Sequence, residues 1–369
     1  MKKLSLILSA LCLGWTLSAQ PGIISTREAN DQGGKVLTME ETILSRELSP
    51  ATIHTMWDDD GTLLTYKDGK FQAYDIATGT YSDYTRKNKL SMQAVSKNGS
   101  LYVIYANGAE RLVAERENDQ ITYGEYVSRN EFGIDGGTFW APNNRKVAFY
   151  RKDESKVTSF PLLDITTRTG SLKEIKYPMA GMDSENVQLG IFDVVTGETV
   201  YAAVDDFGYD RYLTNITWSP DGEMIYIQVL DRSQKHLKLN AYSAQTGDFI
   251  KTILTEDNEK YVEPFDPLYF IKDQNFFIYR TANRDGYRNL YLCDNDGNIR
   301  RLTSVDADVK YVGNDGRYVY YTSAEVSPVE NHLFRIELKN LKKGVAKASF
   351  GKPQRLTFAE GWHEIQLSP

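Results

Sequence analysis

Short polar turns recur along this chain, and each lies between two runs of β-branched and aromatic residues. These turns are Asp60-Gly61, Asn98-Gly99, Asn143-Asn144, Asp221-Gly222, Gln274-Asn275 and Asp315-Gly316. Such dipeptides favour tight β-hairpins, because Asn, Asp and Gly accept the backbone conformations that two-residue turns require. The runs 216–220 and 224–227 on either side of Asp221-Gly222 show the pattern. The repeat predicts antiparallel strands rather than helices.

A second hairpin often follows the first one. Residues 71–84, 237–254 and 289–303 each hold two further runs, joined by Thr78-Gly79, Thr246-Gly247 and Asp296-Gly297. Four strands per unit at a spacing of about 40 residues are typical of a β-propeller. We therefore predict an all-β fold, a β-propeller of about seven or eight four-stranded blades. A sandwich of unrelated hairpins is the alternative, although a single sandwich rarely reaches this length.

Two places depart from the regular repeat. The interval between Asn144 and Asp221 is the widest, and we expect a divergent blade there, around residues 187–195 and 198–204. Residues 362–369 read like the first strand of another blade, but no turn follows them. Because such a strand would leave an unpaired edge, we expect a last blade that is incomplete and truncated at the C-terminus, or closed in another way.

The first residues have the composition of a secretory signal. Met1-Lys2-Lys3 is basic, an apolar run follows, and Leu17-Ser18-Ala19 ends it with small residues. The run is too short for a comfortable membrane span, and the residues before Cys12 match a lipoprotein site poorly. We expect cleavage near Ala19, export to the periplasm or the extracellular space, and no stable membrane anchor. The predicted domains are a signal peptide (1–19), an N-terminal segment (20–50) and the propeller (51–369).

Charge and cysteine content limit the partners. Loss of Lys2 and Lys3 with the signal moves the formal net charge from −7 to about −9, which argues against nucleic acid and anionic membranes as partners. Only Cys293 then remains, so internal disulfides and multi-thiolate zinc sites are excluded from the mature chain. We expect Cys293 to be a small buried residue of a strand.

The sequence contains few motifs that carry chemistry. Gly-x-Ser-x-Gly, His-Glu-x-x-His, a glycine-rich phosphate loop and a calcium loop do not occur. The four histidines show no metal-ligand spacing and are expected at the surface or in turns, and the acids at Asp58-Asp59-Asp60 are expected in a solvated hairpin turn. We predict no metal, no cofactor and no catalytic residue on this chain.

One polar cluster stands apart, namely Arg129-Asn130-Glu131, followed by Phe132 and Gly133. A carboxylate and an amide can together accept hydrogen bonds from a primary ammonium group. Taken alone, the cluster is better explained by a structural ion pair of Glu131 with Arg129 or with a lysine, and ligand binding is the alternative.

Five segments, read together, resemble the N-terminal β-propeller of the dipeptidyl peptidase IV family, within the prolyl oligopeptidase class of serine peptidases. Residues 125–131 are similar to the glutamate motif of that family, and 139–142 to the Trp-Ser-Pro strand after it. Further matches are 177–181 with Asn186-Val187, 212–218 and 285–291, in the family's order. Matching segments extend from about residue 37 to the end.

The resemblance implies a role in peptide recognition. In that family the propeller covers an α/β-hydrolase domain, and the glutamate motif binds the free N-terminal ammonium of the substrate. Glu131 matches the last acid of the motif, while Asn130 falls where many members have another acid. Arg111 would correspond to an arginine that contacts a substrate carbonyl, and residues 261–265 resemble a segment that lines the cavity.

The resemblance also shows what this chain lacks. The family's catalytic serine, aspartate and histidine lie in the hydrolase domain, and none of that domain is encoded here. We therefore expect a chain that gates substrates and recognises their N-terminus and is inactive by itself. Its expected partners are peptides with a free N-terminus and, if it is encoded elsewhere, a hydrolase domain; the sequence is either separated from that domain or an incomplete part of a longer protein. A homodimer is left open. The alternative is a non-enzymatic binding or scaffold propeller.

Overall fold

The structure is a computed structural model that describes residues 38–44, 55–58, 60–67, 69–85 and 92–368. The signal sequence predicted at 1–19 lies outside these residues, as does most of the segment 20–50. The chain divides into two compact units, Met1–Arg86 with Ser368–Pro369, and Lys87–Leu367. Within the described part, no helix is long and apolar enough to cross a membrane.

The described residues of the first unit form one antiparallel sheet and a helical turn at Glu40–Leu44. The four strands follow each other in chain order: β1 (Thr55–Trp57), β2 (Leu63–Lys67), β3 (Lys70–Asp75) and β4 (Thr80–Asp83). Asp60-Gly61 lies between β1 and β2, and Thr78-Gly79 lies between β3 and β4, as the sequence predicts. This order is the meander of a propeller blade.

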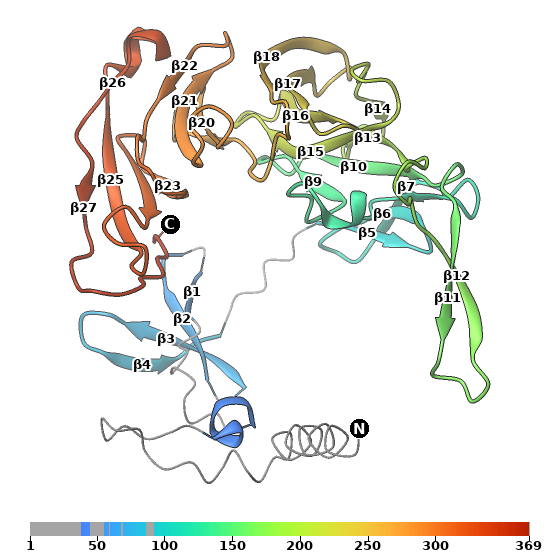
Figure 1. Ribbon diagram of the computed structural model, residues 1–369, viewed down its shortest axis with the longest axis horizontal. Helices are drawn as coiled ribbons and strands as arrows, with labels where there is room; N and C mark the ends of the chain where they lie inside the picture. The colour runs from blue at the N-terminus through green and yellow to red at the C-terminus, as the bar shows by residue number, and fades with distance from the viewer. Residues whose placement is uncertain (1–37, 45–54, 59, 68, 86–91, 369) are drawn as a thin grey trace, which may run out of the picture. The chain divides into compact units, whose positions relative to one another are not determined.

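The second unit contains five larger sheets, which follow one another in chain order (Figure 1). The first is β5 (Gln93–Lys97), β6 (Ser100–Ile104) and β7 (Glu110–Ala114). The second is β8 (Ile121–Tyr123), β9 (Thr138–Trp140), β10 (Lys146–Asp153), β13 (Asn186–Asp193) and β14 (Thr199–Tyr201). The third is β15 (Arg211–Trp218), β16 (Met224–Asp231), β17 (His236–Ser243) and β18 (Phe249–Asp257).

The fourth sheet is β19 (Tyr269–Phe270), β20 (Phe276–Thr281), β21 (Asn289–Asp294) and β22 (Ile299–Arg301). The fifth is β23 (Val309–Asn314), β24 (Tyr318–Ser323), β25 (His332–Lys339), β26 (Ser349–Phe350) and β27 (Gln354–Arg355), with helical turns at Leu341–Lys343 and Val345–Lys347. The all-β propeller prediction is thereby confirmed, with six sheets of three to five strands in the described residues instead of about seven or eight blades.

Four apolar clusters lie between consecutive sheets of the second unit. They combine Leu101 and Val103 with Val147 and Phe149, Ala148 and Leu189 with Ile225 and Ile227, Tyr226 and Leu239 with Phe277 and Tyr291, and Ile278 and Leu292 with Val319 and Ile336. Each inner sheet therefore buries one face against the preceding sheet and the other against the following sheet. Burial of this kind is the main favourable contribution to folding.

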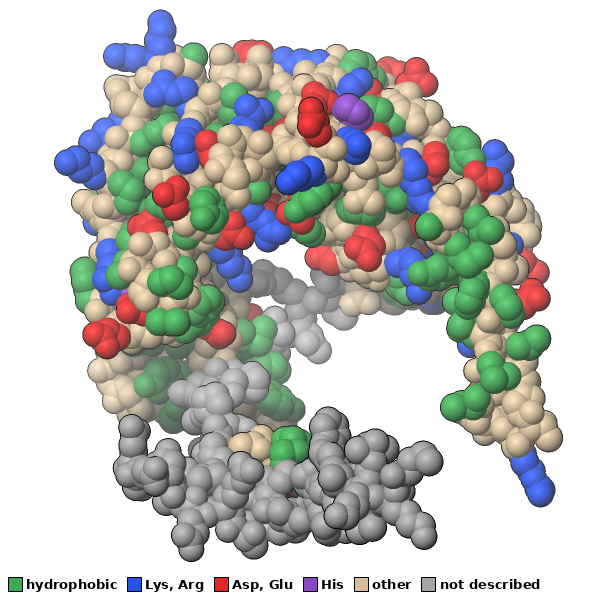
Figure 2. Space-filling model, viewed as in Figure 1, with side chains coloured by type: hydrophobic (Ala, Val, Ile, Leu, Met, Phe, Trp, Pro, Cys, Tyr) green, Lys and Arg blue, Asp and Glu red, His purple; other side chains and the backbone are tan. Residues whose placement is uncertain are grey.

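The interval between Asn144 and Asp221 corrects one prediction. Its hairpin β13–β14 is present, but it pairs with β10 and completes the second sheet of this unit, so it is not a separate blade. An isolated two-stranded arm, β11 (Ser159–Asp164) and β12 (Ser171–Lys176), fills the remaining length. The arm projects from the sheets and carries exposed apolar side chains, including Leu163, Ile165 and Leu172 (Figures 1 and 2).

Each of the predicted turns joins two consecutive strands of one sheet. Asn98-Gly99 is a two-residue turn in which both residues are left-handed, with φ of +52° and +83°. The connection at Asp221-Gly222 is wider, because strand pairing already ends at Trp218 and resumes at Met224. Pro220 at its first corner has no N–H to extend the ladder. Such turns are therefore not the uniform two-residue hairpins that the dipeptides suggest.

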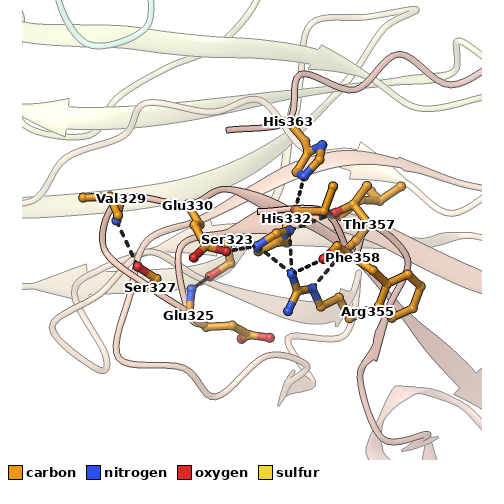
Figure 3. A network of polar contacts seen from close by, with 12 residues as sticks. Ser323, Glu325, Ser327, Val329, Glu330, His332, Arg355, Thr357, Phe358 and His363 are labelled. Carbon is orange, nitrogen blue, oxygen red and sulfur yellow. Dashed lines mark hydrogen bonds and ion pairs between the residues drawn. The ribbon is translucent and has the colours of Figure 1, made fainter. Parts of the chain in front are cut away.

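The C-terminal residues differ from the expected start of a blade. Within 362–368 the only strand-type pairing is a single parallel bridge from Trp362 to Asn331. A polar network fastens the segment before it to β25 (Figure 3). His332 is fully buried, contrary to the surface position predicted, and its ring lies 2.7 Å from Glu330 Oε2 and 2.9 Å from an Arg355 nitrogen.

Gly190 provides a test of packing inside the second sheet of this unit. It pairs with Phe149, and a Cβ at Gly190 would lie 2.4 Å from Cζ of that buried ring. We expect Gly190→Ala to lower the free energy of unfolding by about 1–3 kcal/mol, since the ring cannot move without displacing its neighbours. Urea unfolding followed by tryptophan fluorescence measures the change. Gly136→Ala is the control, because nothing lies within 4 Å of its Cβ position, and an equal loss there would contradict the packing argument.

An ion pair beside β8 and β10 predicts that the free energy of unfolding depends on pH. Arg151 donates two hydrogen bonds to Glu117, of 2.9 and 3.0 Å, and Tyr123 donates another. The bonds from Arg151 first, and from Tyr123 second, hold the pKa of the Glu117 carboxyl below its ordinary 4.5. A lowered pKa means that the unfolded chain binds more protons, so this stabilisation is present at neutral pH and is lost as pH falls through the folded-state pKa.

We therefore expect Glu117→Gln to destabilise the chain at pH 7 and to cost less near pH 3, which lies below the ordinary pKa of 4.5. The Glu117 side chain is 47% exposed, so solvent screening keeps the cost at pH 7 within about 1 kcal/mol. Urea unfolding of both proteins at the two pH values measures it. A cost that is the same at both values would show that the ion pair does not cause it.

Candidate functional site

The predicted glutamate motif lies in a loop that separates β8 from β9, the two short strands that form one edge of the second sheet. Strands β8 and β9 both pair with β10, at Arg151–Asp153 and Val147–Phe149, and the loop 124–137 leaves the sheet between them. Tyr150 closes the neck of this loop, since its carbonyl accepts from Gly124 N–H at 2.9 Å and its N–H donates to Gly137 O at 3.0 Å. The loop is thus anchored at both ends to a buried strand.

The tip of the loop has an unusual backbone. Ser128, Arg129 and Asn130 are consecutively left-handed, with φ of +51°, +55° and +64°, and Phe132 follows with +58°. The conformation costs an L-residue other than glycine roughly 1–2 kcal/mol, and such strain concentrates at functional sites. Glu185 offsets part of the cost: its buried carboxylate accepts the Ser128 N–H at 2.6 Å.

Three contacts hold the tip in place. The ring of Phe132 packs on Tyr212 of β15, with centroids 4.4 Å apart. The guanidinium of Arg129 lies 4.7 Å from the ring centre of Tyr177. Gly133 passes so close to Phe265 that a Cβ would be 2.9 Å from the carbonyl oxygen of that residue. The side chains of Phe132 and Arg129 are therefore both occupied by contacts with neighbouring elements.

Asn130 and Glu131 remain exposed between these anchors. The backbone N–H of Glu131 donates to Ser128 O at 2.9 Å, which closes the turn. In the described part of the chain, the Glu131 carboxylate has no hydrogen-bond or ion-pair partner. The ion pair with Arg129 that the sequence left open is thus not formed, because that guanidinium lies over Tyr177. The tip presents a free carboxylate beside an amide.

A pocket of about 400 Å³ opens beside the tip, against the ends of β10 and β12. Asn130 lines it, whereas Glu131 does not. Its charged lining residues are Arg129, Lys152, Glu154, Lys176 and Glu185.

Lys152 is the central cation of the pocket wall, with its Nζ 3.5 Å from Glu125 and 3.7 Å from Glu154. Burial raises the pKa of the Glu154 carboxyl, and Lys152 opposes that effect. Sequence reasoning missed these residues. The only signal was the charged run 151–154 at the end of a strand, which is indistinguishable from a solvated strand end.

An aromatic segment borders the tip on the other side. Tyr261 and Phe265, which the sequence placed in a cavity-lining segment, are exposed, while Val262 between them is buried with Tyr212. Arg288 lies 4.5 Å above the Phe265 ring. The segment and the tip meet where Gly133 contacts Phe265.

Arg111 lies in a different environment from Asn130 and Glu131. It belongs to β7, and its guanidinium donates to Val194 O at 3.3 Å and Thr196 O at 3.4 Å and lies over Phe192. These contacts join β7 to the β13–β14 hairpin. Arg111 does not line the pocket beside Asn130, and its contact with a substrate carbonyl stays a prediction.

Other candidate groups are structural. Cys293 is buried in β21, as predicted, and burial raises the pKa of its thiol. Across the described residues, no group of three or more His, Cys, Asp or Glu side chains is arranged to hold a metal ion.

Comparison with known proteins agrees with the propeller fold described above. Residues 55–369 match the family model described as the dipeptidyl peptidase IV (DPP IV) N-terminal region. A probable dipeptidyl-aminopeptidase B of Pyrenophora teres f. teres is 23% identical, over 95% of this chain and 45% of the relative. A probable dipeptidyl-aminopeptidase B of Emericella nidulans is 29% identical, over 60% of this chain and 28% of the relative.

Two solved structures share the fold. The crystal structure of a putative dipeptidyl aminopeptidase IV from Bacteroides ovatus has a TM-score of 0.62 and 32% identity, and the match covers 80% of this chain and 45% of that one. Porphyromonas gingivalis dipeptidyl peptidase 4 has a TM-score of 0.63 and 23% identity, over 89% and 49%. The chain spans about half the length of these relatives or less. This chain belongs to the dipeptidyl peptidase IV N-terminal region family.

Proposed function

We propose that this chain recognises the free N-terminus of peptides and controls their access to the active site of a dipeptidyl-peptidase-type serine exopeptidase. Several relatives are named dipeptidyl-aminopeptidases or dipeptidyl peptidases, and this chain corresponds to their N-terminal region. The nucleophile, its base and an oxyanion hole must be close together for amide hydrolysis. We propose that a hydrolase domain supplies them, and that this chain contributes binding alone.

The free carboxylate of Glu131 is the observation that carries the proposal. It is exposed on a strained turn, and the side chains of Arg129 and Phe132 contact other residues, so the carboxylate is available to a ligand. An ammonium group donates three hydrogen bonds, and a charged pair strengthens each of them. Asn130 would accept one of these through its amide oxygen. One formal charge in place of two would make the site weaker for amines than a pair of acids.

A non-enzymatic binding or scaffold propeller is the competing function. Both functions allow peptide binding, but only N-terminus recognition requires a free amine. The two are separated by the dependence of affinity on that amine.

We expect the chain to bind Ala-Pro more tightly than N-acetyl-Ala-Pro, as measured by isothermal titration calorimetry. Glu131→Gln should weaken binding of Ala-Pro by about tenfold, since a charge-assisted hydrogen bond contributes about 1.5–3 kcal/mol. The variant should bind the acetylated peptide as the wild type does.

Asp135→Asn is the matched control, because Asp135 is another exposed acid of the same loop. It should bind Ala-Pro like the wild type, which excludes a general effect of negative charge. Equal affinity of the wild type for both peptides would rule out the amine site and favour the scaffold function.

We also propose that the chain is exported. The support is the composition of residues 1–19, with its basic start, apolar run and small residues before Gln20. Expression of the complete sequence in a Gram-negative host should give periplasmic protein whose first residue is Gln20, as determined by intact mass. Protein that stays in the cytoplasm and still begins at Met1 would contradict export.

A further inference from the structure

β15, the first strand of the third sheet of the second unit, bends at Asn215, next to the loop that carries Glu131. Its pairing with β16 shifts between Thr214 and Thr217, and Asn215 is left-handed with φ of +49°. Such a β-bulge redirects a side chain out of the regular pleat. Asn tolerates this backbone better than most residues, and its side chain here is directed into the protein, since the residue is only 7% exposed.

The carboxamide of Asn215 lies between the two segments that border the proposed ammonium site. Its Nδ2 donates to Pro264 O, in the aromatic segment. Its Oδ1 has no hydrogen-bond partner among the described residues and lies 2.9 Å from the Cβ position of Gly133. Gly133 is two residues after Glu131. An unpaired buried carbonyl is unfavourable, so its retention here calls for another role.

Two further side chains hold the residues directly after the aromatic segment 261–265. Gln228 Nε2 donates to Asp266 O at 2.8 Å, and Thr217 Oγ1 accepts the Leu268 N–H at 3.2 Å. Of these three anchoring residues, Asn215 is the one that also borders Gly133. Asn215 therefore links the loop to the aromatic segment, whereas Gln228 and Thr217 link the residues after that segment to the sheet.

We propose that Asn215 is a positioning residue that sets the distance between the Glu131 carboxylate and the exposed aromatic side chains of Tyr261 and Phe265. The inference rests on the proposed function, because it concerns the same ammonium site. Phe132 holds one flank of the tip against Tyr212, and the Asn215 carboxamide limits how closely the other flank approaches Phe265. Without the carboxamide the tip can shift by the width of an amide group. Discrimination between amines at different distances from the peptide body then falls.

The test measures where the amine is accepted, using Ala-Pro and β-Ala-Pro, whose amine is one methylene further away. We expect the full chain to prefer Ala-Pro by about tenfold, the discrimination that one methylene typically provides. Asn215→Gly removes the carboxamide and keeps a residue that accepts the left-handed backbone. Asn215→Asp keeps the size but replaces the donor to Pro264 O with an acceptor. Both variants should lower the preference about fivefold, because small displacements of a binding group are costly.

Gln228→Leu is the matched control. It removes the hydrogen bond to Asp266 O, and the Gln228 side chain forms no hydrogen bond with Asn215 or Gly133, so the variant should lower the midpoint of urea unfolding and leave the preference unchanged. Thr217 is not suitable as a control, because its hydroxyl donates to Asn215 O at 2.9 Å. A preference that stays at the wild-type value in both folded Asn215 variants would overturn the inference, and so would an equal change in Gln228→Leu. If the wild type instead binds Ala-Pro and N-acetyl-Ala-Pro with equal affinity, the proposed function itself is overturned.

Discussion

Apolar packing between consecutive sheets is the interaction on which the second unit depends. Each of its sheets has few strands, and some of these strands contain only two residues. Sheets of that size are marginally stable in water unless one face is packed against another element. Each of the four clusters between sheets draws residues from both neighbours. Tyr150 shows how the functional loop depends on this packing. It is buried between two sheets, its hydroxyl donates to Leu213 O at 2.7 Å, and its backbone closes the loop neck.

A rigid neck explains how the chain sustains a strained tip. Consecutive left-handed residues would relax in a free loop, since nothing would hold them. Here the neck is anchored by Tyr150, while Glu185, Phe132 and Arg129 each form a contact with another element. These contacts occupy the side chains of Arg129 and Phe132 and leave the Glu131 carboxylate exposed. The strain and the availability of the carboxylate therefore have the same cause.

Much of the fold was predictable because turn chemistry is local. Asn98-Gly99 specifies its hairpin through the backbone preferences of two adjacent residues. The described residues form six sheets, close to the seven or eight blades predicted, and the difference has a related reason. The hairpin β13–β14 has the local pattern of any other hairpin, and only its pairing with β10 shows that it completes an existing sheet. The arm β11–β12 was missed because its exposed leucines and Pro161 do not give the alternation of a half-buried strand.

The sequence by itself determined the all-β class, the position of the turns and, through its resemblance to a family, the segment that carries Asn130 and Glu131. Only the tertiary structure decided which groups are free. Arg129 was the obvious partner of Glu131, yet it lies over Tyr177, and Arg111 is occupied by the β13–β14 hairpin. The bond from Ser128 to Glu185 joins residues 57 positions apart. Turns are encoded by neighbours in the chain, whereas the partners of a side chain depend on which sheets pack together, and no short segment contains that information.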